Sequence, residues 1–367
     1  MGLDVRVIAR IHDFQPRAEI EEAFRREGIS LTLVPHTKNP WPLLSQCFSR
    51  ILRHPSLLDG AALEYADPAY EQVVLDMVQA FKPQVAWLEY TSLWPIMQVL
   101  QRKGIPCIMK SSLIEPLQSM DDNGRTLISR LKAIPKFGGE YIAARESTVL
   151  MALTPDEKAW YDKAGAKRTE LLPLRGLAEC FERRIHTDKQ VCDVVFLSSN
   201  YNMGHNRDAA LFLLKDVIPA VRNRMPGTFR FYLTGSKFPA SFGQYLADDV
   251  VSTGFIPDLA AFLSGMDIAV CPWVTGHGMQ QKVFEPLCRS IPLITNRLSG
   301  YPFKNGEEVC IAASADNYVE ALAFLSVTAN RQNMADAAYK KAKVYFDEAV
   351  LKKTVLSAVD SVRLQNT

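Results

Sequence analysis

Short apolar runs alternate along the chain with longer segments whose apolar residues recur at helical spacing. In the first half, the runs at 5–9, 30–35, 85–88, 106–110 and 149–153 predict strands, and the segments at 18–27, 93–103 and 125–147 predict helices. Gly28 and Gly104 directly follow two of these helices, where glycine commonly ends a helix. Alternation of this kind predicts βαβ units and a parallel sheet.

The same pattern returns after a polar segment at 174–190, which we interpret as a linker. Runs at 191–198, 229–234, 250–255, 267–273 and 291–295 predict strands, and 207–223 predicts a helix. The region 315–364 is almost wholly helical, with a break expected at 345–348. We therefore expect an α/β protein with two doubly wound domains, residues 1–180 and 190–345. A final helix, residues 346–367, would return to the first domain.

Composition narrows the classes of function. The chain has 367 residues, 48% of them hydrophobic, so it can bury more than one core. Its net charge is +2 and neither half is strongly basic, so we expect no nucleic-acid partner. The seven cysteines show no Cys-x-x-Cys spacing. We expect no signal peptide, because residues 1–13 lack the apolar region of one, and no membrane span, because no apolar run is long enough. These features predict a cytoplasmic protein with reduced thiols.

The segment 276–288 carries the most specific chemistry. It joins a glycine-containing loop to an amphipathic helix, between two predicted strands, and so lies at the carboxyl end of a parallel strand. Free N–H groups at the start of such a helix suit phosphate oxygens. Lys282 would supply charge for the phosphates, and Glu285 would bind sugar hydroxyls. The segment predicts a diphosphate cradle.

Five pieces of residues 191–300 together resemble a known family, the nucleotide-sugar glycosyltransferases of family four, and particularly its bacterial exopolysaccharide sugar-transferase branch. They are 196–202 with 206–210, then 229–235 after Pro219 and Pro226, then 253–259, 270–273 and 276–288. In the last piece, Lys282 and Glu285 fall on the family's Lys-x-x-Glu positions. The resemblance implies the GT-B architecture, in which two Rossmann-like domains face each other. In the first half only the order of strands and helices agrees.

The resemblance places the donor site at the strand ends of the second half. It implies that Glu285 accepts hydrogen bonds from the nucleotide ribose and that Lys282 pairs with the diphosphate as a catalytic residue. His277 stands where the family usually has a glutamate, and it is a further catalytic candidate. The predicted donor-binding residues are Ser198, Ser199, Asn206, Gly235, Gly254, Phe255, Ile256, Gly278, Met279, Gln280, Gln281, Lys282 and Glu285.

We expect a metal-independent reaction without a cofactor, because no Asp-x-Asp triplet follows a strand. Charge on the departing nucleoside diphosphate would then be stabilised by basic side chains and helix-end N–H groups. The resemblance favours retention of configuration. An inverting reaction would need a general base, for which His12 and Asp13, after the first strand, are the candidates.

The sequence thus predicts a hexosyltransferase-type enzyme of polysaccharide biosynthesis that moves a sugar from a nucleotide-diphosphate donor to a glycan or lipid-linked acceptor. Arg125, Arg130, Lys132 and Lys136 interleave with apolar residues. One interpretation is that this face contacts the inner membrane peripherally. The simpler interpretation, which we favour, is a solvated helix. Two alternatives stay open, a nucleotide-sugar epimerase of the same fold and a non-catalytic relative that binds nucleotide sugar. No Gly-x-Gly-x-x-Gly follows a strand, which argues against a nicotinamide dehydrogenase.

Overall fold

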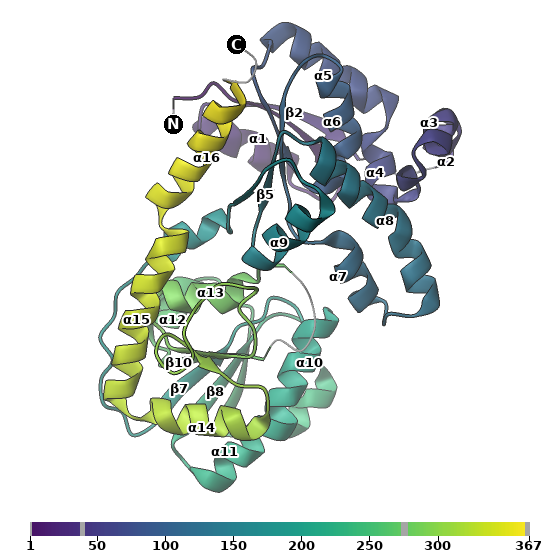
Figure 1. Ribbon diagram of the computed structural model, residues 1–367. Coiled ribbons are helices and arrows are strands. Elements are labelled where there is room, and N and C mark those ends of the chain that lie inside the picture. Colours follow the sequence, from purple (N-terminus) through teal and green to yellow (C-terminus); the bar gives the residue numbers. More distant parts are fainter. Residues whose placement is uncertain (1, 37–40, 273–277, 364–367) are drawn as a thin grey trace. The chain divides into compact units, whose positions relative to one another are not determined.

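The computed structural model describes residues 2–36, 41–272 and 278–363, and the chain divides into two compact units (Figure 1). Unit 1 comprises Met1–Ala152, Lys158–Glu170 and Thr354–Thr367, and unit 2 comprises Leu153–Glu157 and Leu171–Lys353. The polar segment 174–190, predicted as a linker, belongs to unit 2. Its 3-10 helix η3 (Arg175–Cys180) buries Leu177 and Cys180 in the core of that unit.

Two parallel sheets form the described part of unit 1. One pairs β1 (Arg6–Ile11) with β2 (Ser30–Pro35), and the other has the order β3-β4-β5-β6. The predicted parallel pairing is confirmed, but the strands divide between two sheets. β6 was not predicted from the sequence, because it is short and lacks an apolar run. The bounds of the second sheet are β3 (Ala86–Glu89), β4 (Cys107–Lys110), β5 (Val149–Ala152) and β6 (Thr169–Leu171).

Helices cover these sheets, and their starts follow from local capping. The Asp67 side chain accepts the Ala69 N–H at 2.9 Å, and the Thr126 hydroxyl accepts the Ser129 N–H at 3.2 Å. These two caps begin α5 and α8. The helices are α1 (Arg17–Arg26), α2 (Trp41–Gln46), α3 (Phe48–Arg53), η1 (Pro55–Leu58), α4 (Gly60–Tyr65), α5 (Pro68–Phe81), η2 (Thr91–Leu93), α6 (Trp94–Gln101), α7 (Glu115–Asp122), α8 (Leu127–Glu146) and α9 (Pro155–Ala164).

Unit 2 contains one six-stranded parallel sheet with the order β12-β11-β10-β7-β8-β9. Numbered within the unit, this order reads 6-5-4-1-2-3, which is the doubly wound arrangement with its switch point between β7 and β10. The predicted doubly wound domain is therefore confirmed here. Its strands are β7 (Cys192–Phe196), β8 (Phe229–Thr234), β9 (Val250–Gly254), β10 (Ile268–Cys271), β11 (Leu293–Thr295) and β12 (Cys310–Ile311).

The helix predicted at 207–223 has an interruption. It starts at Gly204 and passes through a π-helical turn, η4 (Leu213–Val217), before Pro219. Proline has no N–H to donate and its ring crowds the preceding turn, which accounts for the wider turn there. The break predicted at 345–348 is confirmed at Asp347. The helices are α10 (Gly204–Phe212), α11 (Ile218–Arg224), η5 (Ala240–Tyr245), α12 (Leu259–Ser264), α13 (Gln281–Cys288), α14 (Ala315–Ser326), α15 (Thr328–Phe346) and α16 (Glu348–Arg363).

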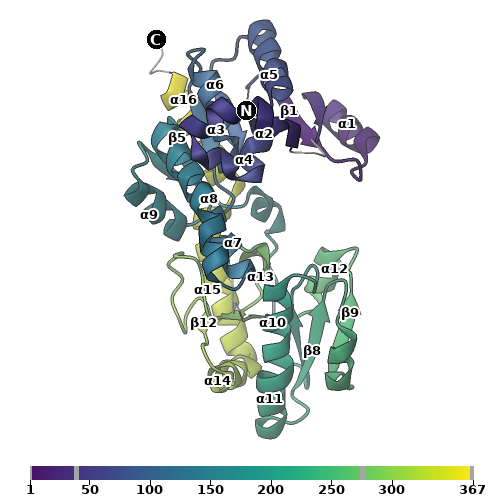
Figure 2. The same ribbon diagram turned by 90° about the vertical axis from the view of Figure 1, so that its right-hand side faces the viewer.

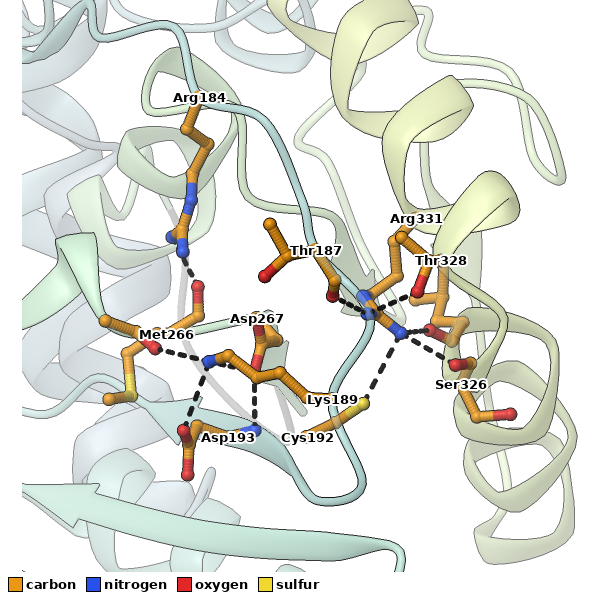
Figure 3. A network of polar contacts seen from close by, with 12 residues as sticks. Arg184, Thr187, Lys189, Cys192, Asp193, Met266, Asp267, Ser326, Thr328 and Arg331 are labelled. Atoms are coloured by element: carbon orange, nitrogen blue, oxygen red, sulfur yellow. Dashed lines mark hydrogen bonds and ion pairs between the residues drawn. The ribbon is translucent and has the colours of Figure 1, made fainter.

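An ion-pair network at the amino end of the unit 2 sheet fixes the segment before β7 (Figure 3). Lys189 Nζ lies 2.8 Å from Asp267 Oδ2 and 3.4 Å from Asp193 Oδ2. The same Asp267 oxygen accepts the backbone N–H of Asp193 at 2.9 Å. Arg184 donates to the carbonyl oxygen of Met266. The start of β7 is thereby tied to the start of β10.

Arg331 of α15 anchors the other side of this segment (Figure 3). Its side chain is fully buried, and it donates to the carbonyl oxygens of Leu325 at 2.9 Å and Ser326 at 2.7 Å. It also donates to the carbonyl oxygen of Thr187 at 3.1 Å and to the hydroxyl of Thr328 at 3.0 Å. Arg331 thus satisfies carbonyls at the end of α14 that no helical N–H can reach.

Candidate active site

The switch point of the unit 2 sheet brings a strand end and a helix start together. β7 and β10 are hydrogen-bonded neighbours, so their carboxyl ends lie at the same edge. β10 leads into α13, which begins without a side-chain cap and without an acidic residue in its first turn. The N–H groups of such a first turn point toward the strand ends and carry the positive end of the helix dipole. This edge therefore favours an anion.

Lys282, in the first turn of α13, places a cation at this edge. Its Nζ donates to Asn206 Oδ1 at 2.7 Å and lies 5.4 Å from the centroid of the Phe196 ring. Burial lowers the pKa of Lys282 below its ordinary value, and the nearby Cys271 thiol only partly offsets that effect. Among the described residues, no carboxylate pairs with Lys282. A desolvated ammonium without a counter-ion is suited to binding an anionic ligand.

Asn206 connects Lys282 to the loop that follows β7. Its side chain is buried, and its Nδ2 donates to the carbonyl oxygen of Asn200 at 2.9 Å. Because Nδ2 donates to Asn200, Oδ1 is left to accept from Lys282, and the two bonds fix the orientation of the amide. The predicted donor residues Asn206 and Lys282 therefore meet in the structure.

The loops after β7 and β8 are joined through Thr234, which sequence analysis missed. Thr234 Oγ1 accepts the Ser198 N–H at 3.0 Å, and its carbonyl oxygen accepts from the Tyr201 hydroxyl at 2.8 Å. The next residue, Gly235, has φ +114°, and a Cβ there would lie 2.7 Å from the Ser198 carbonyl oxygen. Only glycine permits this approach. The sequence signal that could have identified Thr234 is a threonine at the end of an apolar strand, directly before a glycine.

The ends of β8 and β9 continue this edge. The Gly235 N–H donates to the carbonyl oxygen of Gly254 at 2.8 Å, and the Ser236 N–H donates to that of Ser199 at 3.0 Å. Phe255, directly after β9, is 72% exposed, and Ile256 is partly buried. An exposed aromatic ring beside a strand end offers a flat apolar face to a ligand. The residues predicted for the nucleobase loop thus lie on the same edge as Ser198 and Gly235.

Glu285 is buried on α13, and both of its carboxylate oxygens have partners in the same helix. Oε1 accepts from Arg289 Nε at 2.9 Å, and Oε2 accepts from Gln281 Nε2 at 3.0 Å. Sequence analysis missed Arg289, although it follows Glu285 at the i+4 spacing of a helical ion pair. A ligand hydroxyl at Glu285 would replace the exposed Gln281, while the ion pair with Arg289 would remain.

The loop before α13 is described from Gly278 onward. The predicted catalytic residue His277 lies outside the described residues, as does the predicted strand end at Trp273. The Gly278 carbonyl oxygen accepts from the Ser299 hydroxyl at 2.8 Å, and Met279 is buried. The side-chain oxygen of Gln280 is buried and has no hydrogen-bond partner within the described ranges. Gln280 therefore has acceptor capacity left for a ligand.

His12 and Asp13, the candidate bases, follow β1 in unit 1 and are described within that unit alone. The His12 ring lies tilted against the His36 ring, with ring centroids 4.0 Å apart, and it stacks on the Phe14 ring at 5.2 Å. The carboxylate of this cluster, Glu64, pairs with His36. Sequence analysis missed His36 because it follows a different strand, β2, far along the chain. Of the two histidines, His36 is the one that a carboxylate orients.

The seven cysteines are free and buried, as the sequence predicts. Burial raises the pKa of Cys107 to about 12, so its thiol stays protonated and unreactive at neutral pH. Within the described ranges, no group of three or more His, Cys, Asp or Glu side chains is arranged to hold a metal ion. No helix there is both long enough and apolar enough to cross a bilayer.

A known protein family matches the segment that forms the carboxyl edge of the unit 2 sheet. The family described as "Glycosyl transferases group 1" matches residues 192–326. This segment is similar to the group 1 glycosyltransferases. The group 1 domain spans the strands β7 to β12 and contains Asn206, Gly235 and Lys282, so the resemblance seen in the sequence is confirmed. A search of curated proteins finds no match.

Solved structures match the whole chain rather than the group 1 domain alone. A glycosyltransferase from Rickettsia africae has a TM-score of 0.67 at 9% identity, covering 99% of each chain. Sucrose-phosphate synthase from Thermosynechococcus elongatus has a TM-score of 0.63 at 12% identity, covering 97% of this chain and 98% of the other. Anabaena HepE, in complex with UDP-glucose, has a TM-score of 0.63 at 10% identity, covering 97% and 99%. These matches show the GT-B fold, as predicted.

Proposed function

We propose that this protein transfers a sugar from a nucleotide-diphosphate donor, bound at the carboxyl edge of the unit 2 sheet, to a hydroxyl group of an acceptor. One observation carries the proposal. Within a group 1 glycosyltransferase domain, Lys282 lies at the switch point, partly desolvated, with an amide oxygen rather than a carboxylate as its partner. A nucleoside diphosphate supplies the negative charge that this position lacks.

We propose that Lys282 and the first turn of α13 stabilise the negative charge that develops during transfer. As the bond between the donor's anomeric carbon and the diphosphate oxygen breaks, negative charge grows on the departing diphosphate. The Lys282 ammonium and the backbone N–H groups of Gln281 and Lys282 would donate hydrogen bonds to this diphosphate. Gly278, Met279 and Gln280 precede them in the chain. We propose that this transfer needs neither a metal ion nor a cofactor, and that His277 contacts the transferred sugar or the diphosphate.

The nucleoside half of the donor would extend along the strand ends. Glu285 would accept a ribose hydroxyl in place of Gln281, and Phe255 with Gly254 would flank the base. Ser198 and Ser199 would line the sugar and phosphate side. Because Anabaena HepE is described in complex with UDP-glucose, UDP sugars are the first donors to test.

The acceptor, we propose, is a glycan or a lipid-linked glycan in a cytoplasmic pathway of polysaccharide synthesis. In a retaining reaction the acceptor proton passes to the leaving diphosphate oxygen, so no protein base is required. An inverting reaction would instead use His12 or Asp13 to take that proton. The domain match is to a family of transferases, which does not favour the epimerase alternative.

Calorimetric titration with UDP, GDP and ADP sugars tests the donor site. Lys282→Met keeps the length of the side chain and removes its charge. Loss of a hydrogen bond to a charged group, about 1.5–3 kcal/mol, corresponds to roughly 10- to 150-fold weaker binding. Lys340→Met, on the exposed face of α15, is the matched control and should bind as the wild type does. Equal affinity of the wild type and Lys282→Met would overturn the assignment.

Turnover assays then separate the three functions. A transferase releases nucleoside diphosphate faster when acceptor is added and forms a new glycoside. An epimerase yields the epimeric sugar without any acceptor. Binding without turnover in the presence of candidate acceptors would identify a non-catalytic relative.

A further inference from the structure

The first half of α8 in unit 1 exposes a row of large apolar side chains. Leu127, Ile128, Leu131 and Ile134 are between 57% and 74% exposed. Their spacing places them on one face of the helix, while Ser129 and its neighbours on the opposite face are buried. Scattered apolar residues on a surface need no explanation, but a contiguous row of four does.

Basic side chains border this row, and acidic ones are absent from it. Residues 123–139 contain four basic residues and no aspartate or glutamate. Arg125 pairs with Asp121, and Lys136 pairs with Asp59 at 2.9 Å. Arg130 and Lys132 are exposed and form no ion pair within the described part of the chain. At 100° per residue they fall on the two sides of the apolar row.

Two neighbouring elements of unit 1 also expose apolar side chains, which the sequence pattern did not reveal. The 3-10 helix η1 lies directly against α8, since a Cβ on Gly138 would meet the Ser56 hydroxyl at 2.1 Å. α3 contacts η1 in turn. Figures 1 and 2 label α3 and α8 within unit 1. These two elements contribute three more apolar side chains, which are between 59% and 68% exposed: Phe48, Leu52 and Leu58.

We propose that the α8 face docks on an anionic membrane surface, with the apolar row among the acyl chains and Arg130 and Lys132 on the lipid phosphates. An apolar face with basic borders is typical of helices that lie in the plane of a bilayer. A second copy of the chain is a poor occupant, because a two-fold contact across this face would bring basic borders together without acidic partners. The membrane contact is independent of the transfer reaction.

Sedimentation with lipid vesicles tests this proposal. Vesicles of phosphatidylcholine mixed with phosphatidylglycerol should bind the full chain, and vesicles of phosphatidylcholine alone should bind it much less. Each basic residue near such a surface contributes about 1 kcal/mol, so Arg130→Gln and Lys132→Gln should each weaken binding about fivefold. The double variant Leu131→Glu/Ile134→Glu should weaken it by at least about tenfold.

Matched controls come from α15 in unit 2. Val344→Glu alters an apolar side chain that is 58% exposed, and Lys340→Gln removes an exposed charge. Both controls should bind vesicles as the wild type does. All of the altered side chains are exposed, so thermal unfolding should show every variant folded. Nucleotide binding in solution should be unchanged in the α8 variants, which separates a failure of this proposal from a failure of the donor site.

Three results would overturn the membrane assignment. The wild type could fail to bind anionic vesicles, or the α8 variants could bind as tightly as the controls. Sedimentation velocity could also show a dimer that Leu131→Glu/Ile134→Glu dissociates, in which case a second copy of the chain covers the face.

Discussion

Gly235→Ala is the substitution whose effect the structure specifies most fully. Gly235 ends β8 with φ +114°, and a Cβ there would lie 2.7 Å from the Ser198 carbonyl oxygen and 3.0 Å from its carbonyl carbon. Both contacts are with backbone atoms, so no side chain can rotate away. The loop after β7 would have to move, and that loop also holds Asn206 through the Asn200 carbonyl oxygen.

The expected loss of stability has two parts. A non-glycine residue held in this region of φ costs about 1–3 kcal/mol. Overpacking against a rigid neighbour costs a further 1–3 kcal/mol or so. The sum is about 2–6 kcal/mol. Gly227→Ala is the matched control, because Gly227 also has positive φ, +72°, but has open space where the Cβ would lie. The left-handed conformation alone predicts a loss of about 1–2 kcal/mol there.

Chemical unfolding and calorimetric titration of both variants provide the assay. Gly235→Ala should unfold at clearly lower denaturant concentration than Gly227→Ala. It should also bind the nucleotide donor more weakly, whereas Gly227→Ala should bind it normally. Equal losses of stability in the two variants, or wild-type affinity in Gly235→Ala, would show that the close approach at Gly235 has no role in shaping the site.

Three further predictions concern buried ionisable side chains. Burial lowers the pKa of Lys282, so its charge is lost at a lower pH than that of an ordinary lysine. Nucleotide affinity, measured by calorimetry across pH, should therefore fall as pH rises through this lowered pKa. The Lys282→Met variant should show no such fall. Arg331→Met should lose about 3–5 kcal/mol of unfolding free energy, because carbonyls at the end of α14 lose their donor. Arg183→Met, which breaks an exposed pair with Asp336, should lose under about 1 kcal/mol in the same experiment. Burial raises the pKa of Glu140 to about 8 in the folded protein, so the folded state holds a proton that the unfolded state releases. Its contribution to stability is therefore complete below the ordinary glutamate pKa and decreases, by up to about 1.4 kcal/mol per pH unit, as pH rises toward 8. In Glu140→Gln, unfolding followed across pH should lack that decrease, and a profile identical to the wild type would exclude a protonated Glu140.

Sequence analysis succeeded where a local pattern determines the structure. The apolar runs 30–35 and 229–234 are β2 and β8, because a short strand needs little more than a run of apolar residues between turns. Lys282 and Asn206 were both predicted donor residues, and the structure joins them at 2.7 Å. Both residues were chosen from a family resemblance, since 76 residues separate them in the chain, and their role in donor binding stays a prediction.

The features that sequence analysis missed depend on contacts between distant segments. Thr234 is an ordinary strand residue until the β7 loop packs on it, and His36 becomes a partner of His12 only because β1 and β2 pair. The split of the unit 1 strands into two sheets has no local signal either. The apolar surface on α3 and η1 is invisible in the sequence for a similar reason, since exposure is decided by what packs nearby.

Hydrogen exchange measured by mass spectrometry, with and without the nucleotide donor, shows where the donor binds. Slower exchange is expected in peptides that cover 198–206 and 278–285, where the loop after β7 meets the first turn of α13. The Lys282→Met variant, at the same donor concentration, should show little of this protection. Donor-dependent protection confined to other segments, with these two unchanged, would contradict the assignment of the donor site to the switch point of the unit 2 sheet.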